Sequence, residues 1–548
     1  MIEEWIQECQ QNHPQCQQLI TPVLPTRVID VGGGGRDPCL VHSQGRAGQY
    51  LALSHRWGDP ASHVTKLVTT KENISQHCQR IPMSKIPATF RDAIIVARCL
   101  RIPYVWIDSL CIVQNDRNDW NAESSRMGDV YENAFATLFA ERSRHCADGL
   151  ASTGRDLDTA RERFQTFQFQ QDGSPGTSHE VFVSTKLRTY PNSLRAAFCL
   201  FGETRSYLET RGWILQEEIL SRRKICFSAT ELHWQCKQIK ICDCGLRATV
   251  LKGMRDVPNF TAGLLNNVSW DDQVTKRTLS ARDYGDSRLS MNSDKSWRKL
   301  VEAYTRRELS FDTDRLAALA GIVSKMSKSM GDADTHYLAG IWRAHAPSHL
   351  LWRASTSSGA LPCRRQRSGF APSFSWASVT GSVSFLSTKG LDGPNFPQPS
   401  VPLEVLPAHL TSLSGSDACL FVRSKALRAI AYKRRKTDDA THDHQGNNAY
   451  EVGFCVLNPG NQLLPFQQLL LDTPEDWEYF TEDQDREFLF LVTHIVPAFS
   501  FFRHPKGLLL REVARGRYER VCLVPEVPFD YKWETIGEWA FDVEIHLV

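Results

Sequence analysis

Three groups of polar residues in this sequence could carry chemistry. Ser54-His55-Arg56-Trp57 directly follows one short apolar run, and Asp108 directly follows another. Trp120 and Glu123 stand near the start of a segment with helical periodicity. A carboxylate stabilises a developing positive charge, a guanidinium pairs with phosphate and an indole stacks on rings. These residue types could therefore line a binding or catalytic pocket.

The same residues also have structural interpretations. Glu123 could simply favour the positive amino end of its helix. Trp57 and Trp120 could be ordinary packing aromatics, and Asp108 could cap the turn after its strand. From the residues alone, both interpretations stay open.

The elements that must position these residues alternate between strand and helix. The apolar run 50–53 predicts a strand, and 86–102 predicts a helix with Thr89 and Asp92 as a capping pair. "YVWID" (104–108) predicts a second strand, and a second helix precedes the apolar "ATLFA". Such alternation is typical of a parallel sheet covered by helices. Because functional groups gather at the carboxyl ends of parallel strands, we expect these residues to meet at one edge: Ser54, His55, Arg56, Asp108 and Ser109, with Glu123 carried toward them.

A further polar set lies in "RGWILQEEILSRRKICFSATELHWQC" (211–236). This block predicts a short helix at 213–220 and two strands at 224–228 and 231–236. Gln216 and Glu217 could complete the site, but Glu217 could equally form a structural ion pair with Arg211.

Two groups of cysteine and histidine could serve a metal. The first, at helical spacing, comprises Cys9, His13 and Cys16. It has no evident fourth ligand, and zinc prefers four, so one face of a docked helix is the alternative. The second comprises Cys236, Cys242 and Cys244 with His233 nearby, and its spacing matches no common zinc pattern. We therefore predict no metal site. The apolar surroundings of Cys111 should raise its pKa and leave it unreactive.

The composition narrows the class of protein. The net charge of +2 argues against a dedicated nucleic-acid binder. The 16 cysteines are scattered through apolar runs, as reduced buried thiols often are. The amino end lacks the apolar core of a signal peptide, and 487–502 falls short of a membrane span. We expect a protein of the cytoplasm without a membrane span.

The 548 residues are expected to divide into several parts. These are a helix and hairpin lead-in at 1–44, an α/β domain at 45–250 with a loop insertion near 154–190, a linker at 251–295 and an α+β region of unknown role at 296–548. The four glycines at 32–35 predict a hairpin turn, because a dinucleotide fingerprint needs a helix directly after them.

Three blocks taken in order resemble the HET domain, the heterokaryon-incompatibility domain of filamentous fungi. They are "YLALSHRWG" (50–58), 86–134 and 211–236, and the match spans roughly residues 45–220. Residues 26–31, 303–322 and 372–385 resemble segments that flank the domain in long members. The family usually has a tyrosine and a small residue before the tryptophan, where this sequence reads Ser54-His55-Arg56-Trp57.

The resemblance implies non-self recognition, innate immunity and programmed cell death. The HET domain is similar to TIR domains, which have a flavodoxin-like parallel sheet, and some of which cleave the glycosidic bond of NAD with one glutamate shortly after a tryptophan. By that likeness Glu123, three residues after Trp120, is the catalytic counterpart. The NAD-binding residues would be Ser54, Arg56, Trp57, Asp108 and Trp120.

NAD would be the substrate, and no cofactor is firmly implied. Neutral nicotinamide leaves without a general acid, so one carboxylate can suffice to stabilise the oxocarbenium-like ribose. Two alternatives are a module that triggers death by oligomerising without chemistry, and a HET fold recruited to a biosynthetic or regulatory role. The expected partners are a second copy of the chain or a separate incompatibility or sensor protein.

Overall fold

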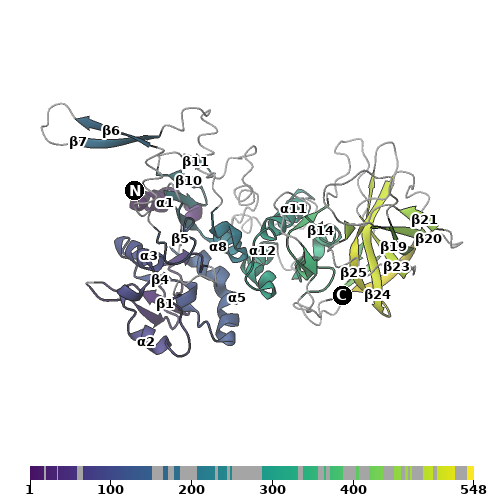
Figure 1. Cartoon of the computed structure of the whole chain (residues 1–548), viewed down its shortest axis with the longest axis horizontal. Helices are drawn as coiled ribbons and strands as arrows, with labels where there is room; N and C mark the ends of the chain where they lie inside the picture. Colours follow the sequence, from purple (N-terminus) through teal and green to yellow (C-terminus); the bar gives the residue numbers. More distant parts are fainter. Residues whose placement is uncertain are drawn as a thin grey trace. The chain divides into compact units, whose positions relative to one another are not determined.

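The chain folds into two units (Figure 1). The first unit comprises Met1–Arg277 with Ala317–Ile322, and the second comprises Thr278–Leu316 with Val323–Val548. The computed structural model describes residues 1–17, 20–33, 35–58, 66–150, 164–170, 178–184, 206–228, 232–243, 247–249, 287–330, 337–355, 363–365, 371–386, 403–406, 419–435, 450–457, 463–466, 470–471, 486–497, 503–524, 538 and 540–548.

The first unit is built on a nine-stranded sheet with a parallel centre. Across the sheet the order is β11 (Arg247–Thr249), β10 (Ile239–Cys242), β9 (Leu232–Cys236), β8 (Arg223–Phe227), β5 (Ala136–Phe139), β3 (Tyr50–Ser54), β4 (Tyr104–Trp106), β1 (Arg27–Asp30) and β2 (Cys39–His42). Strands β8, β5, β3 and β4 run parallel, and the outer strands pair antiparallel. The predicted α/β sheet is confirmed.

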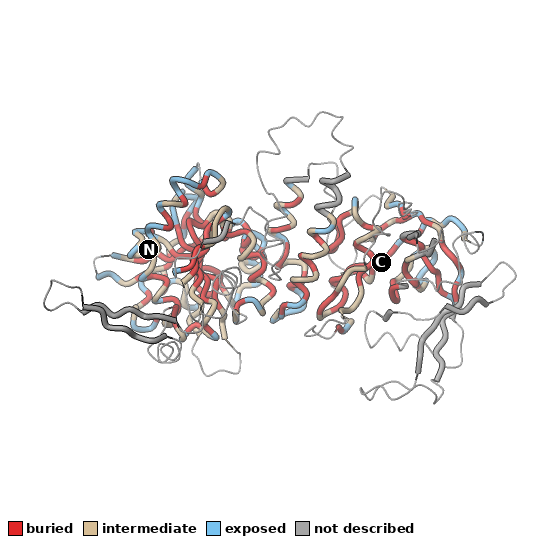
Figure 2. The backbone as a smooth tube through the Cα atoms, turned by 90° about the horizontal axis from the view of Figure 1, so that it is seen from above, coloured by how far each residue is buried: buried red, intermediate tan, exposed pale blue. Residues whose placement is uncertain are grey.

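Buried apolar residues concentrate in the central strands of this sheet (Figure 2). All five residues of β3 and all four of β5 are buried, as expected for strands covered on both faces. The helices among the described residues of the unit include α1 (Ile2–Asn12), α2 (Ile74–Gln79), α3 (Ala88–Cys99), α4 (Asp108–Cys111), α5 (Arg117–Asn133) and α8 (Gly212–Leu220).

The predicted capping pair of α3 is wrong. The helix begins at Ala88, directly after Pro87, so Thr89 already lies inside the first turn. The Thr89 hydroxyl accepts a hydrogen bond from the Gly149 amide at 3.1 Å, and Asp92 accepts one from the Leu150 amide at 2.8 Å. These side chains therefore fasten the loop after β5 onto the helix.

The glycine-rich segment forms the predicted hairpin between β1 and β2. Gly32 has φ of +66°, and a Cβ there would lie 2.6 Å from the Arg36 carbonyl oxygen, so only glycine fits. Gly34 lies outside the described residues. The insertion predicted near 154–190 carries a two-stranded hairpin, β6 (Phe164–Gln170) with β7 (Ser178–Ser184).

The second unit contains a closed ring of five strands, β19 (Leu420–Arg435), β23 (Arg486–Pro497), β24 (Arg503–Ala514), β25 (Arg517–Val524) and β26 (Phe541–Leu547). The ring closes because β26 pairs with both β25 and β19, which leaves no free edge among these strands. Helices α11 (Ser287–Tyr304) and α12 (Ala320–Met330) precede it. The predicted α+β character is thus a β-barrel with helices. Helix α11 begins inside the expected linker 251–295.

Helix α13 (Ala346–His349) ends in a buried polar network of the second unit. His349 Nε2 lies 3.2 Å from Asp294 Oδ1, and its Nδ1 accepts a hydrogen bond from the Trp342 amide. Arg298 and the Ser348 hydroxyl donate to the same aspartate at 2.7 and 2.6 Å. Burial alone would raise the pKa of Asp294, but His349 and Arg298 outweigh it and hold that pKa well below its usual range.

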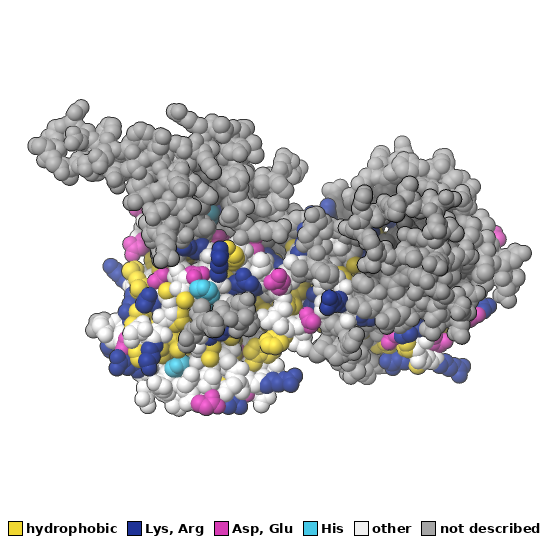
Figure 3. Space-filling model, in the orientation of Figure 1, with side chains coloured by type: hydrophobic (Ala, Val, Ile, Leu, Met, Phe, Trp, Pro, Cys, Tyr) yellow, Lys and Arg dark blue, Asp and Glu magenta, His cyan; other side chains and the backbone are white. Residues whose placement is uncertain are grey.

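No helix in the described part of the chain has the length and apolarity needed to span a membrane. On the face seen in Figure 3, cationic and anionic side chains of the described residues are interspersed. That pattern agrees with the nearly balanced charge of the sequence.

Candidate active site

Polar side chains gather at the carboxyl ends of β3 and β4. Ser54 ends β3, His55 follows it, and Asp108 stands two residues after the end of β4. The parallel register pairs Ala52 with Trp106, so both strands end at the same edge of the sheet. The edge expected from the sequence is therefore formed, and it brings Ser54, His55 and Asp108 together.

Asp108 joins the two strand ends. Its Oδ2 accepts a hydrogen bond from Trp57 Nε1 at 2.8 Å, and its Oδ1 accepts one from the Ser109 amide at 2.7 Å. The same Oδ1 lies 3.7 Å from His55 Nδ1. Asp108 thus binds the turn after its strand, as the structural interpretation held, and also orients Trp57, whereas His55 lies just beyond hydrogen-bond distance.

Helix α8 delivers a second carboxylate to this edge. Glu217 is 4% exposed, and burial raises its pKa to about 7. The nearby Ser54 hydroxyl and the Arg211 charge oppose that rise, whereas the Asp108 charge adds to it. A carboxyl with a pKa near neutrality can both accept and donate a proton at physiological pH, which is the property that acid–base groups need.

Arg211 connects α8 to the end of β3. Its Nη1 donates to the backbone oxygen of His55 at 2.6 Å, and its positive charge also helps to lower the pKa of His55. Burial is the main cause of that change and brings the pKa of His55 to about 4, against the pull of Asp108. His55 is therefore neutral at physiological pH.

Several buried polar atoms at this edge lack a hydrogen bond of normal geometry to any described residue. They are Ser54 Oγ, both ring nitrogens of His55, Ser109 Oγ and Glu217 Oε2. An unsatisfied buried polar atom costs about 1–3 kcal/mol, so a fold rarely gathers several at one place without a use for them. Their convergence at one sheet edge is the strongest sign of a ligand-binding site in this unit.

Glu123 and Trp120 lie on α5, which packs against α8. Asp116 caps this helix by accepting hydrogen bonds from the Asn118 and Asp119 amides. The helix begins at Arg117, which places Glu123 in its second turn, where the helix dipole has largely faded. The interpretation that Glu123 simply favours the positive amino end of its helix is therefore weakened. Its side chain is only 4% exposed, and its charge is one of several that act on the pKa of Cys111.

Trp120 bridges α5 and α8. Its ring meets that of Trp213 edge to face, with centroids 6.2 Å apart. Trp213 stands two residues after Arg211, so the contact brings the start of α5 toward the edge that holds Glu217. Trp120 is half-buried and Arg56 is also partly exposed, so both remain accessible to a ligand.

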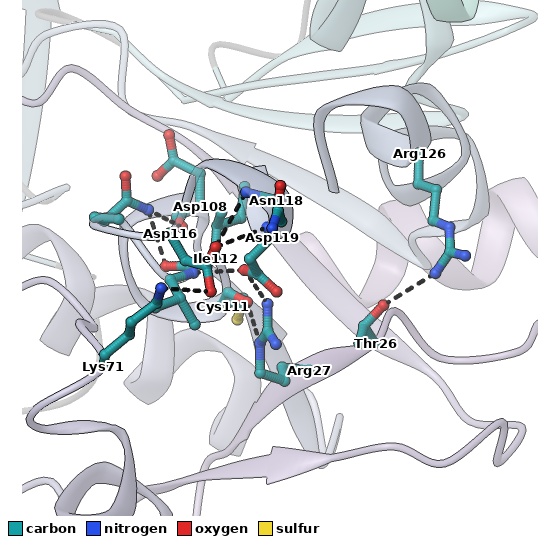
Figure 4. Close-up of polar contacts among 12 residues, drawn as sticks. Thr26, Arg27, Lys71, Asp108, Cys111, Ile112, Asp116, Asn118, Asp119 and Arg126 are labelled. Carbon is teal, nitrogen blue, oxygen red and sulfur yellow. Dashed lines mark hydrogen bonds and ion pairs between the residues drawn. The ribbon is translucent and has the colours of Figure 1, made fainter. Parts of the chain in front are cut away.

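The other carboxylates at the start of α5 are structural (Figure 4). Arg27 donates to Asp119 Oδ2 and, at 2.7 Å, to the Cys111 backbone oxygen. Asp119 Oδ2 also accepts from the Val113 amide at 2.8 Å. Asp119 therefore fastens α5, the turn after α4 and strand β1 together. The acidic residues after β4 thus have two roles: Asp108 lies in the candidate site, and Asp119 stabilises the packing of α5.

Cys111 and the cysteines of the β9–β10 hairpin lie in different surroundings. Cys111 is buried, and burial raises its pKa to about 12, as predicted. Cys236 and Cys242 end neighbouring antiparallel strands and lie at opposite ends of the β9–β10 hairpin. Cys242 stands opposite His233, and Cys244 lies outside the described residues.

Comparison with family models matches residues 50–217 to the model described as heterokaryon incompatibility protein (HET). No curated protein and no solved structure matches the chain. The matched range starts at the first residue of β3 and ends at Glu217. It therefore includes all six residues predicted for the site, and also Arg211 and Glu217, whose place the sequence left open.

Proposed function

We propose that this protein, which carries a HET domain at residues 50–217, acts by cleaving NAD at the carboxyl edge of its first sheet. The HET domain implies the wider role, which is heterokaryon incompatibility, a fungal non-self recognition that leads to cell death. The proposal adds the reaction and the place where it occurs.

The observation that carries the proposal is the environment of Glu217. This buried carboxyl has a pKa of about 7 and shares the edge with Asp108, Ser54 and the neutral imidazole of His55. Perturbed carboxyls in the company of unsatisfied polar atoms are typical of functional sites. The edge offers hydrogen-bond donors and acceptors for ribose hydroxyls and negative charge for a cationic ring.

The chemistry fits the charge of the substrate. The nicotinamide ring of NAD is a cation, and its arrival beside Glu217 would favour the ionised form of that carboxyl. When the ring leaves as neutral nicotinamide, the positive charge moves to the ribose, where a carboxylate stabilises it. Water then adds to the ribose and releases one proton, which gives ADP-ribose. No general acid is needed for the leaving group.

The resemblance to TIR domains assigns the ribose contact to Glu123, and the fold adds Glu217 as a second buried carboxylate. In the proposal Glu123 stabilises the reacting ribose, and Glu217 binds its hydroxyls together with Ser54. The partly exposed Arg56 pairs with the phosphates. Trp120, held against Trp213, offers a stacking face.

The test uses the full chain expressed in yeast and the purified protein. NAD content, growth and NAD turnover are measured for the wild type, Glu123→Gln and Glu217→Gln. Glu132→Gln is the matched control, because it makes the same change on α5 at a half-buried position. Each variant must accumulate to the level of the wild type.

Loss of NAD with growth arrest in the wild type and the control, but not in Glu123→Gln, would support the proposal. If only Glu217→Gln loses activity, NAD cleavage stands and the catalytic carboxylate is Glu217. Arrest by all four proteins with NAD unchanged would overturn the enzymatic reading in favour of death signalling by oligomerisation.

A further inference from the structure

Four metal-ligand side chains converge at the amino end of the first unit. Cys9 lies in the last turn of α1, His13 caps that helix, and Cys16 ends the following 3-10 turn Pro14–Cys16. The fourth is Cys236, the last residue of β9, which arrives from the distant β9–β10 hairpin. None of the four lies in the residues matched to the HET family.

The spacing of the donor atoms fits a single ion. The three sulfurs and the imidazole nitrogen all lie within 4.8 Å of one another, and Cys236 Sγ lies 3.4 Å from His13 Nδ1. Ligands held tetrahedrally at about 2.3 Å from one zinc ion would stand about 3.8 Å apart. Only a slight contraction is needed to reach that geometry.

From this convergence we propose that Cys9, His13, Cys16 and Cys236 bind one zinc ion. Three cysteines and one histidine are an established ligand set for structural zinc. All four residues are buried, the most exposed being His13 at 6%. Four protein ligands leave no open position for a substrate, so the ion would stabilise the fold rather than catalyse. This proposal replaces the expectation of no metal.

The surroundings supply what a thiolate-rich zinc site requires. The amides of Gln238 and Ile239 donate to Cys236 Sγ, each at 3.5 Å. Arg223 Nε donates to Cys9 Sγ at 3.4 Å, and its Nη2 donates to the Cys16 backbone oxygen at 2.7 Å. Zinc with three thiolates and one neutral histidine carries a net charge of −1, which the buried Arg223 offsets. Such outer hydrogen bonds orient ligands and stabilise thiolate charge.

The plain alternative is a packed group of reduced thiols. Three neutral sulfurs and an imidazole nitrogen within 4.8 Å of one another would then share a buried site with no ion between them. A dication would allow all three thiols to ionise together. Thiols packed as apolar side chains would also gain nothing from a buried imidazole among them.

The first experiment measures the metal content of the purified full chain, prepared without chelator, by mass spectrometry. We expect one zinc per chain. After exchange into Co²⁺, we expect the visible absorption of tetrahedral cobalt and the near-ultraviolet thiolate charge-transfer band. Both measurements use the wild type, so they hold even if a ligand variant fails to fold.

Variants then assign the ligands. Cys236→Ser and His13→Ala should each lose most of the bound zinc and the tetrahedral cobalt spectrum. Cys242→Ser is the matched control, since it makes the same change at a buried position of the same hairpin. Cys99→Ser changes an exposed cysteine. Both controls should keep one zinc per chain.

Two results would overturn the proposal. One is a wild-type chain that folds without stoichiometric metal and gives no tetrahedral cobalt spectrum. The other is retention of zinc by Cys236→Ser and His13→Ala at the level of the controls. NAD cleavage does not enter any of these measurements, so the zinc site and the proposed reaction succeed or fail separately.

Discussion

Each unit of this protein buries a histidine beside an aspartate, and the two pairs differ in how fully they are satisfied. In the second unit, Asp294 receives His349, Arg298 and Ser348 together. In the first unit, Asp108 holds Trp57, but His55 lies 3.7 Å away and neither of its ring nitrogens bonds to a described residue.

The comparison shows that a perturbed pKa alone does not identify a site. Burial lowers the pKa of both His55 and His349 to about 4. What separates them is the hydrogen bonding around each histidine, because His349 Nδ1 accepts a hydrogen bond from the Trp342 amide and neither ring nitrogen of His55 has a partner among the described residues. A histidine that is hydrogen-bonded into its surroundings is structural, whereas a sheet edge that leaves several buried polar atoms without partners has capacity for a ligand.

The largest expected effect on stability concerns the Asp294–His349 pair of the second unit. Asp294→Ala removes the acceptor that holds Arg298, Ser348 and His349, and we expect it to lower the free energy of unfolding of the second unit by roughly 3–5 kcal/mol. Hydrogen exchange followed for α11 and α13 measures this loss. Asp108→Asn should cost far less stability while it impairs NAD cleavage. Equal losses of stability in the two variants would remove the distinction.

The second prediction concerns the pH dependence of Glu217. Its folded pKa of about 7 lies above the ordinary value of 4.5, so the folded state holds a proton that the unfolded state has released. Stability therefore falls as pH rises from about 4.5 to 7, by about 3 kcal/mol. Glu217→Gln lacks this fall and should gain that amount relative to the wild type across the window. Urea unfolding at matched pH values measures the difference, and a difference independent of pH would refute the raised pKa.

His55 should show the opposite sign. Its folded pKa of about 4 lies below the ordinary 6.5, so the unfolded state binds the extra proton, and stability rises between pH 4 and 6.5 by about 3 kcal/mol. In the wild type this rise and the Glu217 fall nearly cancel. The variant His55→Gln should therefore become less stable relative to the wild type as pH rises. The double variant with His55→Gln and Glu217→Gln lacks both effects. Its stability relative to the wild type should therefore change little with pH.

The smallest effect is expected one residue before Glu217. Gln216 is fully buried, and its Oε1 accepts a hydrogen bond from the Gly321 amide at 2.7 Å within the first unit. Gln216→Ala should lower the free energy of unfolding by about 1 kcal/mol, with no change in its pH dependence. NAD cleavage by this variant should stay near that of the wild type. A larger effect on cleavage than that of Glu217→Gln would mean that the two neighbours had been assigned the wrong roles.

The parallel centre of the sheet could be predicted from the sequence because its signals are local. Apolar strands such as 50–53 end abruptly in polar residues, and helical periodicity lies between them. The outer strands carry no such alternation. The capping pair of α3 was predicted wrongly because Thr89 and Asp92 match a capping pattern although they bind the loop at Gly149 and Leu150.

The candidate site was predictable only where it follows strand ends. The residue types at Ser54 and Asp108 indicated that edge directly. The role of Glu217 could not be decided, because its burial and the direction of Arg211 depend on how α8 docks. Cys236 could not be joined to Cys9 and Cys16 because no local spacing links residues so far apart.

The sequence separation of these residues determines when the amino-terminal helix can dock during synthesis. His13 and Cys236 are 223 residues apart, and synthesis at 5–20 residues per second takes roughly 10 to 45 s to cover such a distance. During that interval the first three ligands have left the ribosome while the hairpin that completes the set has not been made. The amino-terminal helix therefore cannot take its final place until the strands with the Ser54 and Asp108 edge have emerged. Docking of this helix would thus report that all four parallel strands of the first sheet had been synthesised.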